Sequence, residues 1–301
     1  SSGPARQSPL VWLPRILAAV VLLYALQTLY SPDFSKSLQN VCFFFIPFSL
    51  VFALLRDVEW DRRLLVGVLW VIGLEAVVFD LDGTLCRYAI SVEEVFRAAL
   101  PRAGIDPDVL GDPAEAAAEY ARLWGEVQAT LESTDRIRLH IIERLLGERG
   151  VDDATLAARL SDAYGAVRDE TGIRAFEGAG ELLEELKERY ALGLLTNGPS
   201  DMQWEKIRSL GFGRSFDAIV VAGDVGIYKP DRRAFEALLA RLDVRPSAAL
   251  FVGDNHPLDI VGAHRAGMRT AWVKRNGARP SEDVVPDIEI DGVTALREVL
   301  L

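Results

Sequence analysis

The sequence predicts an α/β fold with a parallel sheet, on three observations. Apolar runs of strand length recur along the chain, each run ends in polar or charged residues, and segments of helical period lie between them. The runs with their polar ends are residues 76–79, 191–198, 218–221 and 249–255. In open α/β sheets, the side chains that follow the carboxyl ends of the strands gather at one edge and form the ligand site. We therefore expect the chemistry of this chain at its strand ends.

The first strand end holds two acidic residues. Residues 77–79 are apolar, Asp80 and Asp82 follow one residue apart, and Gly83 and Thr84 turn the chain. Two carboxylates in different surroundings can serve as a nucleophile and a general acid/base. The same residues are also compatible with a strand that ends in a simple Asp-Gly turn. The later strand ends bear on this choice.

The later strand ends supply side chains of complementary chemistry. Thr196 and Asn197 follow the second run, Lys229 lies in a loop after the third, and Asp254 and Asp259 follow the fourth. Taken singly, these are explained by a turn, a solvated loop lysine and a helix N-cap. Together they provide hard oxygen ligands for Mg²⁺ and hydroxyl and ammonium donors for phosphate oxygens. The set favours phosphoryl transfer with a carboxylate nucleophile.

With these motifs in this order, residues 75–301 resemble the haloacid dehalogenase-like (HAD) hydrolases. Residues 252–263 and 266–268 are especially similar to the fourth motif of that family and the helix after it. The resemblance implies a Rossmann-like parallel sheet core with an inserted helical cap. It also implies a phosphomonoester hydrolase, with a phosphotransferase as the less favoured form.

The resemblance further implies a role for each strand-end residue. Asp80 would attack phosphorus and form an aspartyl-phosphate, and Asp82 would protonate the leaving oxygen and then activate water. The phosphate would be held by Thr196, Lys229 and the backbone around Asn197. The Mg²⁺ ion would be held by Asp80, the carbonyl of Asp82, and Asp254, supported by Asp259. The physical logic agrees, because two anions approach each other only where cations offset their repulsion.

Asp82 separates two reaction classes within the family. The dehalogenases that gave the family its name work without magnesium and lack an acid at this position. The resemblance therefore implies that a chain with Asp82 transfers phosphoryl groups. A magnesium-dependent phosphatase for a small phosphorylated metabolite is the expected function.

The segment between the first two motifs predicts a helical cap. Apolar residues recur at helical spacing over residues 92–100, 114–128, 136–146 and 154–167. We expect residues 74–86 and 177–301 to form the core and residues 87–176 to form the cap. A lid that excludes water strengthens the charge interactions beneath it. Residues 132–140 are the expected substrate-reading surface, the alternative being that Arg136 and Arg138 only decorate a helix.

Residues 1–73 predict a membrane anchor. Residues 10–30 form an apolar run long enough to span a bilayer, and residues 41–55 form a second, shorter run. Arg56, Arg62 and Arg63 follow the second run, which favours a hairpin with both ends in the cytoplasm. This would hold the catalytic domain at the inner face of the cell membrane through residues 10–55. A soluble apolar core is the alternative explanation.

The N-terminal segment also bears on a rival function. Residues 30–58 resemble part of an O-antigen ligase-like polytopic membrane protein, and a HAD-like core needs only a few residues before its first strand. The sequence leaves open whether residues 1–73 are a natural anchor or a fused fragment. The rival hypothesis is a membrane-glycan assembly component in which the hydrolase-like domain is secondary.

Charge argues against a nucleic-acid partner, and cysteine content argues against a disulfide framework and a zinc site. Residues 1–75 hold six basic and five acidic residues, whereas the rest of the chain holds 27 and 39. This acidic balance argues against nucleic acid as a partner. With only Cys42 and Cys86, neither a disulfide framework nor a zinc-type spacing is predicted. The oligomeric state and the identity of the phosphate ester are not encoded in any pattern we recognise.

Overall fold

The computed structural model describes residues 73–130, 133–274, 280 and 284–301. These residues belong to one compact unit, Trp70–Leu301. Among them no helix is long and apolar enough to cross a bilayer. The predicted anchor over residues 10–55, and with it the rival function based on residues 30–58, lies outside the described residues.

A parallel sheet forms the centre of this unit, as the sequence predicts. Its six strands lie in the order β5-β4-β1-β6-β7-β8, and each strand is parallel to its neighbours. The strands are β1 (Ala76–Phe79), β4 (Ala191–Thr196), β5 (Ala218–Val221), β6 (Ala249–Gly253), β7 (Arg269–Val273) and β8 (Ile288–Ile290). The first four agree with the predicted runs. The chain first extends the sheet from β1 through β4 to β5 and then returns to the other side of β1 with β6. This reversal beside β1 is the switch point where open α/β sheets bind ligands.

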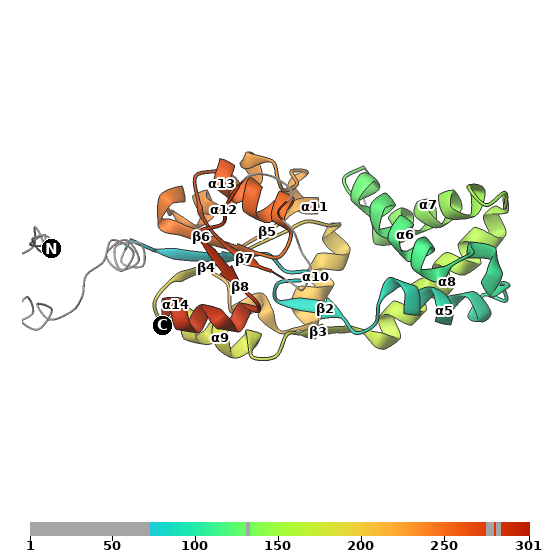
Figure 1. Ribbon diagram of the computed structural model, residues 1–301, viewed down its shortest axis with the longest axis horizontal. Coiled ribbons are helices and arrows are strands. Elements are labelled where there is room, and N and C mark those ends of the chain that lie inside the picture. The colour runs from blue at the N-terminus through green and yellow to red at the C-terminus, as the bar shows by residue number, and fades with distance from the viewer. Residues whose placement is uncertain (1–72, 131–132, 275–279, 281–283) are drawn as a thin grey trace, which may run out of the picture. The chain divides into compact units, whose positions relative to one another are not determined.

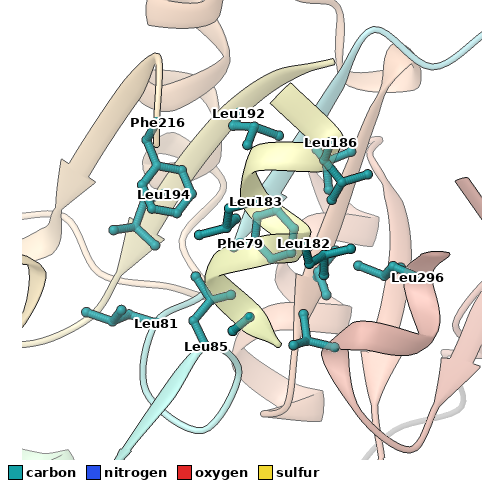
Figure 2. Packing of buried hydrophobic residues seen from close by; sticks show 14 of the residues in the cluster. Phe79, Leu81, Leu85, Leu182, Leu183, Leu186, Leu192, Leu194, Phe216 and Leu296 are labelled. Atoms are coloured by element: carbon teal, nitrogen blue, oxygen red, sulfur yellow. The ribbon is translucent and has the colours of Figure 1, made fainter. Parts of the chain in front are cut away.

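Helices cover both faces of the sheet. Successive side chains of β1 point to opposite faces, and both sets are apolar, so each face must be covered. Val77 and Phe79 pack in one apolar cluster, and Ala76 and Val78 in another. The Phe79 side is covered by α9 (Ala179–Lys187), α10 (Ser200–Ser209) and α14 (Arg297–Leu300), and the other side by α12 (Arg232–Leu242) and α13 (Gly262–Arg265) (Figure 1). In Figure 2 the leucines of α9 lie over Phe79 and Leu194. This two-sided burial fixes the strand ends in place.

Four helices and a short 3-10 turn are inserted between β2 (Cys86–Tyr88) and β3 (Ile173–Ala175). The helices are α5 (Val92–Arg102), α6 (Pro113–Val127), α7 (Thr134–Gly147) and α8 (Ala154–Thr171), with η3 (Pro107–Leu110) after the first. Side chains at their N-caps set where they begin: Ser91 forms a capping box with Glu94, and Asp112, Ser133 and Asp153 accept from the first turns. The cap at Ser133 starts α7 two residues before the predicted apolar period. The insert has its own buried cluster, which includes Phe96, Leu123 and Ile141.

An antiparallel ribbon connects the insert to the sheet. β2 pairs with β3, with Cys86 opposite Ala175 and Tyr88 opposite Ile173. The sequence did not predict this ribbon, because three-residue strands are too short to show an alternating pattern. The ribbon straddles the predicted limits of the cap after residue 86 and before residue 177.

The remaining connections are short and close to the strand ends. They are η4 (Phe212–Arg214), α11 (Ala222–Val225), η5 (Pro246–Ala248), η6 (His256–Val261), which is a turn of π-helix, and η7 (Val293–Leu296). α11 precedes the loop of Lys229, and η6 begins two residues after Asp254, with Asn255 as its N-cap. Both therefore place polar side chains beside β1.

Candidate active site

Three parallel strands bring the predicted residues to one edge of the sheet. Asp80 follows β1, Thr196 ends β4, and Asp254 follows β6. Lys229 comes from the loop between α11 and α12, and Asp259 from η6. All five residues line one cavity of about 890 Å³. The structure thus brings together side chains up to 179 positions apart in the sequence, from Asp80 to Asp259.

Asp80 is buried and held by two donors. Its Oδ1 atom lies 2.6 Å from the Nζ atom of Lys229, and its Oδ2 atom accepts from the hydroxyl of Thr84 at 3.2 Å. Thr84 is itself buried and belongs to the turn after β1. The carboxylate is therefore fixed in orientation at the end of its strand.

Burial raises the pKa of Asp80 to about 8. Lys229 opposes this shift, whereas the negative charges of Asp259 and Asp254 add to it. Burial is thus the main cause, and the neighbouring carboxylates add to it. Such a group requires a further positive charge to be ionised at neutral pH.

Lys229 is the buried cation between two acids. Its Nζ atom lies 2.8 Å from Oδ1 of Asp259 as well as 2.6 Å from Asp80. Burial by itself would lower the pKa of Lys229, but the carboxylates of Asp259 and Asp80 outweigh it, so the pKa lies above its usual range. Lys229 therefore acts as a fixed positive charge at this site.

The side chain of Asn197 orients Lys229. Its Oδ1 atom accepts from the backbone N–H of Lys229 at 2.8 Å, and its Nδ2 atom donates to the carbonyl of Lys229 at 2.9 Å. Both polar ends of the amide are thus used within the protein. The hydroxyl of Thr196 donates to the carbonyl of Asn197 at 3.3 Å. Asn197 joins the loop after β4 to the loop of Lys229.

Asp80, Asp254 and Asp259 form a group that could hold a metal ion. Each offers a carboxylate oxygen, and these oxygens lie within 4.8 Å of one another. If all three are ionised, they outnumber the single ammonium of Lys229 by two negative charges. Hard oxygen donors with this charge excess suit a divalent cation such as Mg²⁺. The residues present therefore fit the metal that the sequence resemblance implies.

Two glycines allow these acids to come so close. A Cβ atom at Gly83 would lie 2.2 Å from Oδ2 of Asp254, and one at Gly253 would lie 2.4 Å from Oδ2 of Asp259. Gly83 also has a φ of 87°, in the left-handed region that favours glycine. Asp259 is held in turn by the backbone N–H of Asn255, at 2.9 Å from its Oδ2 atom.

Asp82 has a different set of partners, which the sequence did not predict. Nζ of Lys206 lies 2.8 Å from each of its carboxylate oxygens, and Nε2 of Gln203 donates to Oδ2 at 2.9 Å. Gln203 and Lys206 lie three residues apart on the buried face of α10. The sequence did contain a signal for this placement. Gln203 and Lys206 recur at the helical spacing of the apolar Ile207, so all three lie on the same face of the helix. Asp82 itself is partly exposed to the cavity.

The insert supplies the other wall of the cavity. Its lining residues include Tyr120, Trp124, Tyr164, Arg138 and Arg168. Of the predicted substrate-reading segment 132–140, Thr134, Asp135 and Arg138 line the cavity, whereas Glu132 lies outside the described residues. Arg138 is bound to Asp135 at 2.6 Å and to the hydroxyl of Ser161 at 3.2 Å.

His256 and Cys86, which follow the strands β6 and β1, lie outside the lining of this cavity. His256 is buried and its ring lies against Trp272, at 4.9 Å between centroids, with Nε2 3.0 Å from the carbonyl of Val284. Cys86 is buried, and burial raises the pKa of its thiol well above the usual range. Both side chains support the surrounding loops by packing.

Comparisons with known proteins agree with this geometry. The family model of the haloacid dehalogenase-like hydrolases matches residues 74–267. Glyceraldehyde 3-phosphate phosphatase of Methanopyrus kandleri is 32% identical over 233 residues, which cover 75% of this chain and 97% of that protein. Phosphoserine phosphatase of Thermus thermophilus is 39% identical over 147 residues, which cover 48% and 57% of the two chains. The chain therefore belongs to the haloacid dehalogenase-like hydrolases.

A solved structure extends the comparison to the fold. The 2-haloacid dehalogenase from Pseudomonas syringae pv. Tomato DC3000 is 32% identical, with a TM-score of 0.55 over 75% of this chain and 98% of that one. Together with its phosphatase relatives, these matches identify the chain as an enzyme, a hydrolase of the phosphatase type. The family model begins at residue 74, and the likeness of residues 30–58 to a membrane protein has no support in these comparisons.

Proposed function

We propose that this protein is a magnesium-dependent phosphatase that hydrolyses a small phosphorylated metabolite through an aspartyl-phosphate. The observation that supports this most is the buried Asp80, bound to Lys229 and grouped with Asp254 and Asp259 at the floor of a large cavity. A carboxylate nucleophile, a fixed cation and an acidic metal site are the parts that phosphoryl transfer through a phosphoenzyme requires.

In the first half-reaction, a carboxylate oxygen of Asp80 attacks phosphorus while the bond from phosphorus to the ester oxygen breaks. Asp82 gives a proton to that oxygen, so the product leaves as an alcohol. Lys229 and Thr196 bind the phosphoryl oxygens as charge shifts between them. The protein now carries a phosphoryl group on Asp80 and a carboxylate at Asp82.

In the second half-reaction, Asp82 takes a proton from a water molecule that attacks the same phosphorus atom. The bond between phosphorus and Asp80 breaks, and inorganic phosphate leaves. Asp82 regains the proton that it lost, so the sum of the two halves is ester plus water giving alcohol plus phosphate. One residue thus serves as acid and then as base.

Asp80, Asp254 and Asp259, with the carbonyl of Asp82, would hold Mg²⁺ at the floor of the cavity. When bound, the ion supplies positive charge that lets two anions meet and that stabilises the phosphoryl oxygens. Burial disfavours the carboxylate form of Asp80 and raises its pKa, which supports a role for this added positive charge.

The insert would act as the cap that selects the ester. We propose that residues 87–176 form this cap and that residues 74–86 and 177–301 form the catalytic core. The aromatic and arginine side chains on the cap wall would contact the organic part of the substrate. The relatives named after glyceraldehyde 3-phosphate and phosphoserine support a small phosphorylated metabolite as the substrate class.

Asp82 supports phosphate esters over haloacids, although one solved relative is a dehalogenase. Dehalogenation has no leaving group that needs a proton from an acid. The placement of Asp82 at the cavity, bound to Lys206 and Gln203, is explained by the proton transfers of phosphatase chemistry.

The test is hydrolysis of 4-nitrophenyl phosphate and a panel of phosphorylated metabolites by the full chain, with Mg²⁺ and with a chelator. We expect turnover only with Mg²⁺, and none with Asp80→Asn. Asp243→Asn, an exposed change at the end of α12, is the matched control and should keep full activity. Turnover by Asp80→Asn at the wild-type rate would contradict the assignment of the nucleophile.

Attachment to the membrane is a separate proposal that rests on the apolar pattern of residues 10–55. It places the catalytic unit at the cytoplasmic face, in agreement with the arginines that follow the second run. Extraction of membranes with alkaline carbonate tests it. Retention of the full chain in the pellet supports the anchor, and release into the supernatant contradicts it.

A further inference from the structure

Lys206 is a buried lysine that faces the site from helix α10. Its side chain is 2% exposed, and its Nζ atom contacts both carboxylate oxygens of Asp82 at 2.8 Å. Among the described residues, Asp82 is the only carboxylate within ion-pair distance of it. A buried ammonium is unfavourable unless it is paired. The burial of Lys206 therefore depends on Asp82.

The surroundings of Lys206 keep it charged. Burial by itself would lower its pKa, but the carboxylate of Asp82 outweighs this, and the pKa lies above its usual range. The ring of Tyr88, on β2, covers the ammonium at 4.7 Å from Nζ to the ring centroid. Both contacts stabilise the ammonium form of Lys206 in this structure.

Gln203 adds a second point of attachment. Its Nε2 atom donates both to Asp82 and to the carbonyl of Asn197, the residue whose side chain holds the backbone of Lys229. Gln203 is 1% exposed and lines the cavity. It thus joins the catalytic acid to the loop after β4.

We propose that Lys206 and Gln203 are positioning residues that hold the carboxylate of Asp82 at the angle needed for proton transfer. This inference rests on the proposed function, in which Asp82 is the general acid and base. Asp82 directly precedes the turn of residues 83–85, and these donors restrict its side chain to one of the staggered positions open to it. The Lys206 ammonium also balances the charge of Asp82 after the proton has gone to the leaving oxygen. No proton moves to or from Lys206 in either half-reaction.

The test compares two aryl esters that differ in their need for a proton. 4-Nitrophenolate leaves without protonation, whereas the unsubstituted phenolate is a poorer leaving group and gains more from an acid. With Lys206→Met in the full chain, we expect kcat/KM for phenyl phosphate to fall by about 10- to 100-fold. For 4-nitrophenyl phosphate, the fall should be at least fivefold smaller, on the order of a few-fold. A purely structural role would lower both values by the same factor.

Two more variants separate the acid role of Asp82 from the positioning role of Lys206. They are Asp82→Asn and the double variant Asp82→Asn/Lys206→Met. If Lys206 acts through Asp82, its replacement changes nothing further once Asp82→Asn is present. An additional loss in the double variant, or an unchanged phenyl to 4-nitrophenyl ratio in Lys206→Met, overturns the inference. If Asp82→Asn itself leaves the ratio unchanged, the proposed acid role of Asp82 fails, and the inference falls with it.

Two further variants guard against loss of folding. Gln203→Leu removes a donor to Asp82 without leaving a buried charge, and it should shift the same ratio in the same direction by a smaller factor. Lys187→Met, at an exposed lysine of α9, is the matched control and should leave the ratio unchanged. A wild-type ratio in both Gln203→Leu and Lys206→Met would contradict the positioning role.

Discussion

The charge balance differs between two regions of the cavity. The floor holds Asp80, Asp254, Asp259 and Lys229, and the α10 wall holds Lys206 beside Asp82. At the floor, three carboxylates lie together and Lys229 contacts two of them, Asp80 and Asp259, so negative charge is in excess. At the wall, Lys206 and Asp82 form a one-to-one pair. The floor is therefore incomplete without an added cation, whereas the wall is balanced by the protein alone. The comparison teaches that the acidic floor suits an added cation, as the proposed function requires, whereas the pair at the wall needs none.

The largest expected effect is at the cation of the floor. We expect Lys229→Met to lower kcat/KM for 4-nitrophenyl phosphate by on the order of 10³-fold, because the ammonium that contacts both Asp80 and Asp259 is lost. Steady-state kinetics with saturating Mg²⁺ measures this. Lys274→Met, at a partly exposed lysine bound to Glu289, is the control. A loss no larger than that of Lys206→Met would remove the distinction between floor and wall.

The second effect concerns the metal. Asp254→Asn removes one of the negative charges of the floor, so we expect Mg²⁺ affinity to fall by about 100-fold. Titration calorimetry on the full chain gives the dissociation constant directly, without reference to catalysis. Asp82→Asn changes a side chain of the wall and should alter this constant by less than about threefold, since the expected ligand there is a backbone carbonyl. Equal losses in both variants would break the comparison.

The third effect is a dependence on pH. The pKa of Asp80 is about 8 without metal, so below that pH the floor holds a proton that Mg²⁺ must displace. Mg²⁺ affinity should therefore rise by about tenfold per pH unit from pH 6 to pH 8 and then level off. The sign for stability is opposite: the metal-free fold gains from the raised pKa at low pH and loses this as pH rises through about 8.

Calorimetry at several pH values, and in buffers of different ionisation enthalpy, measures both the affinity and the proton released. Asp80→Asn is the control, because it has no proton to displace and should show a flatter profile. An equal wild-type affinity at pH 6 and pH 8 would mean that Asp80 is ionised in the metal-free protein.

The smallest effect is at Thr84. The isosteric change Thr84→Val removes the hydroxyl that donates to Oδ2 of Asp80, and one hydrogen bond is worth about 1 kcal/mol. We expect kcat to fall by about three- to tenfold with little change in Mg²⁺ affinity. Thr155→Val, at an exposed position in α8, should have no effect on kcat. A fall of more than about 100-fold would place Thr84 among the residues that contact the reacting atoms.

Much of the fold was predictable because local patterns determine it. The strands that bear Asp80, Thr196 and Asp254 are short apolar runs, and the inserted helices show an apolar period with capping residues at their starts. The strands β2, β3 and β8 have three residues each, which is too short for a period to be recognised. Their pairing depends on neighbours that are distant in the sequence.

The sequence by itself determined which residues would meet, since the carboxyl ends of parallel strands share one edge. Only the tertiary structure decided how they are held. The backbone around Asn197 was expected to help hold the phosphate, and the structure adds that the side chain of Asn197 binds the backbone of Lys229. Lys206 and Gln203 were not expected at all, because a polar residue on the buried face of a helix has a partner only when the fold supplies one. In the sequence, Asp82 is one of two acids that follow a strand. In the structure, it forms an ion pair with Lys206. The physical reason is that side-chain contacts across the sheet depend on packing in three dimensions, whereas strand order and spacing follow from the chain.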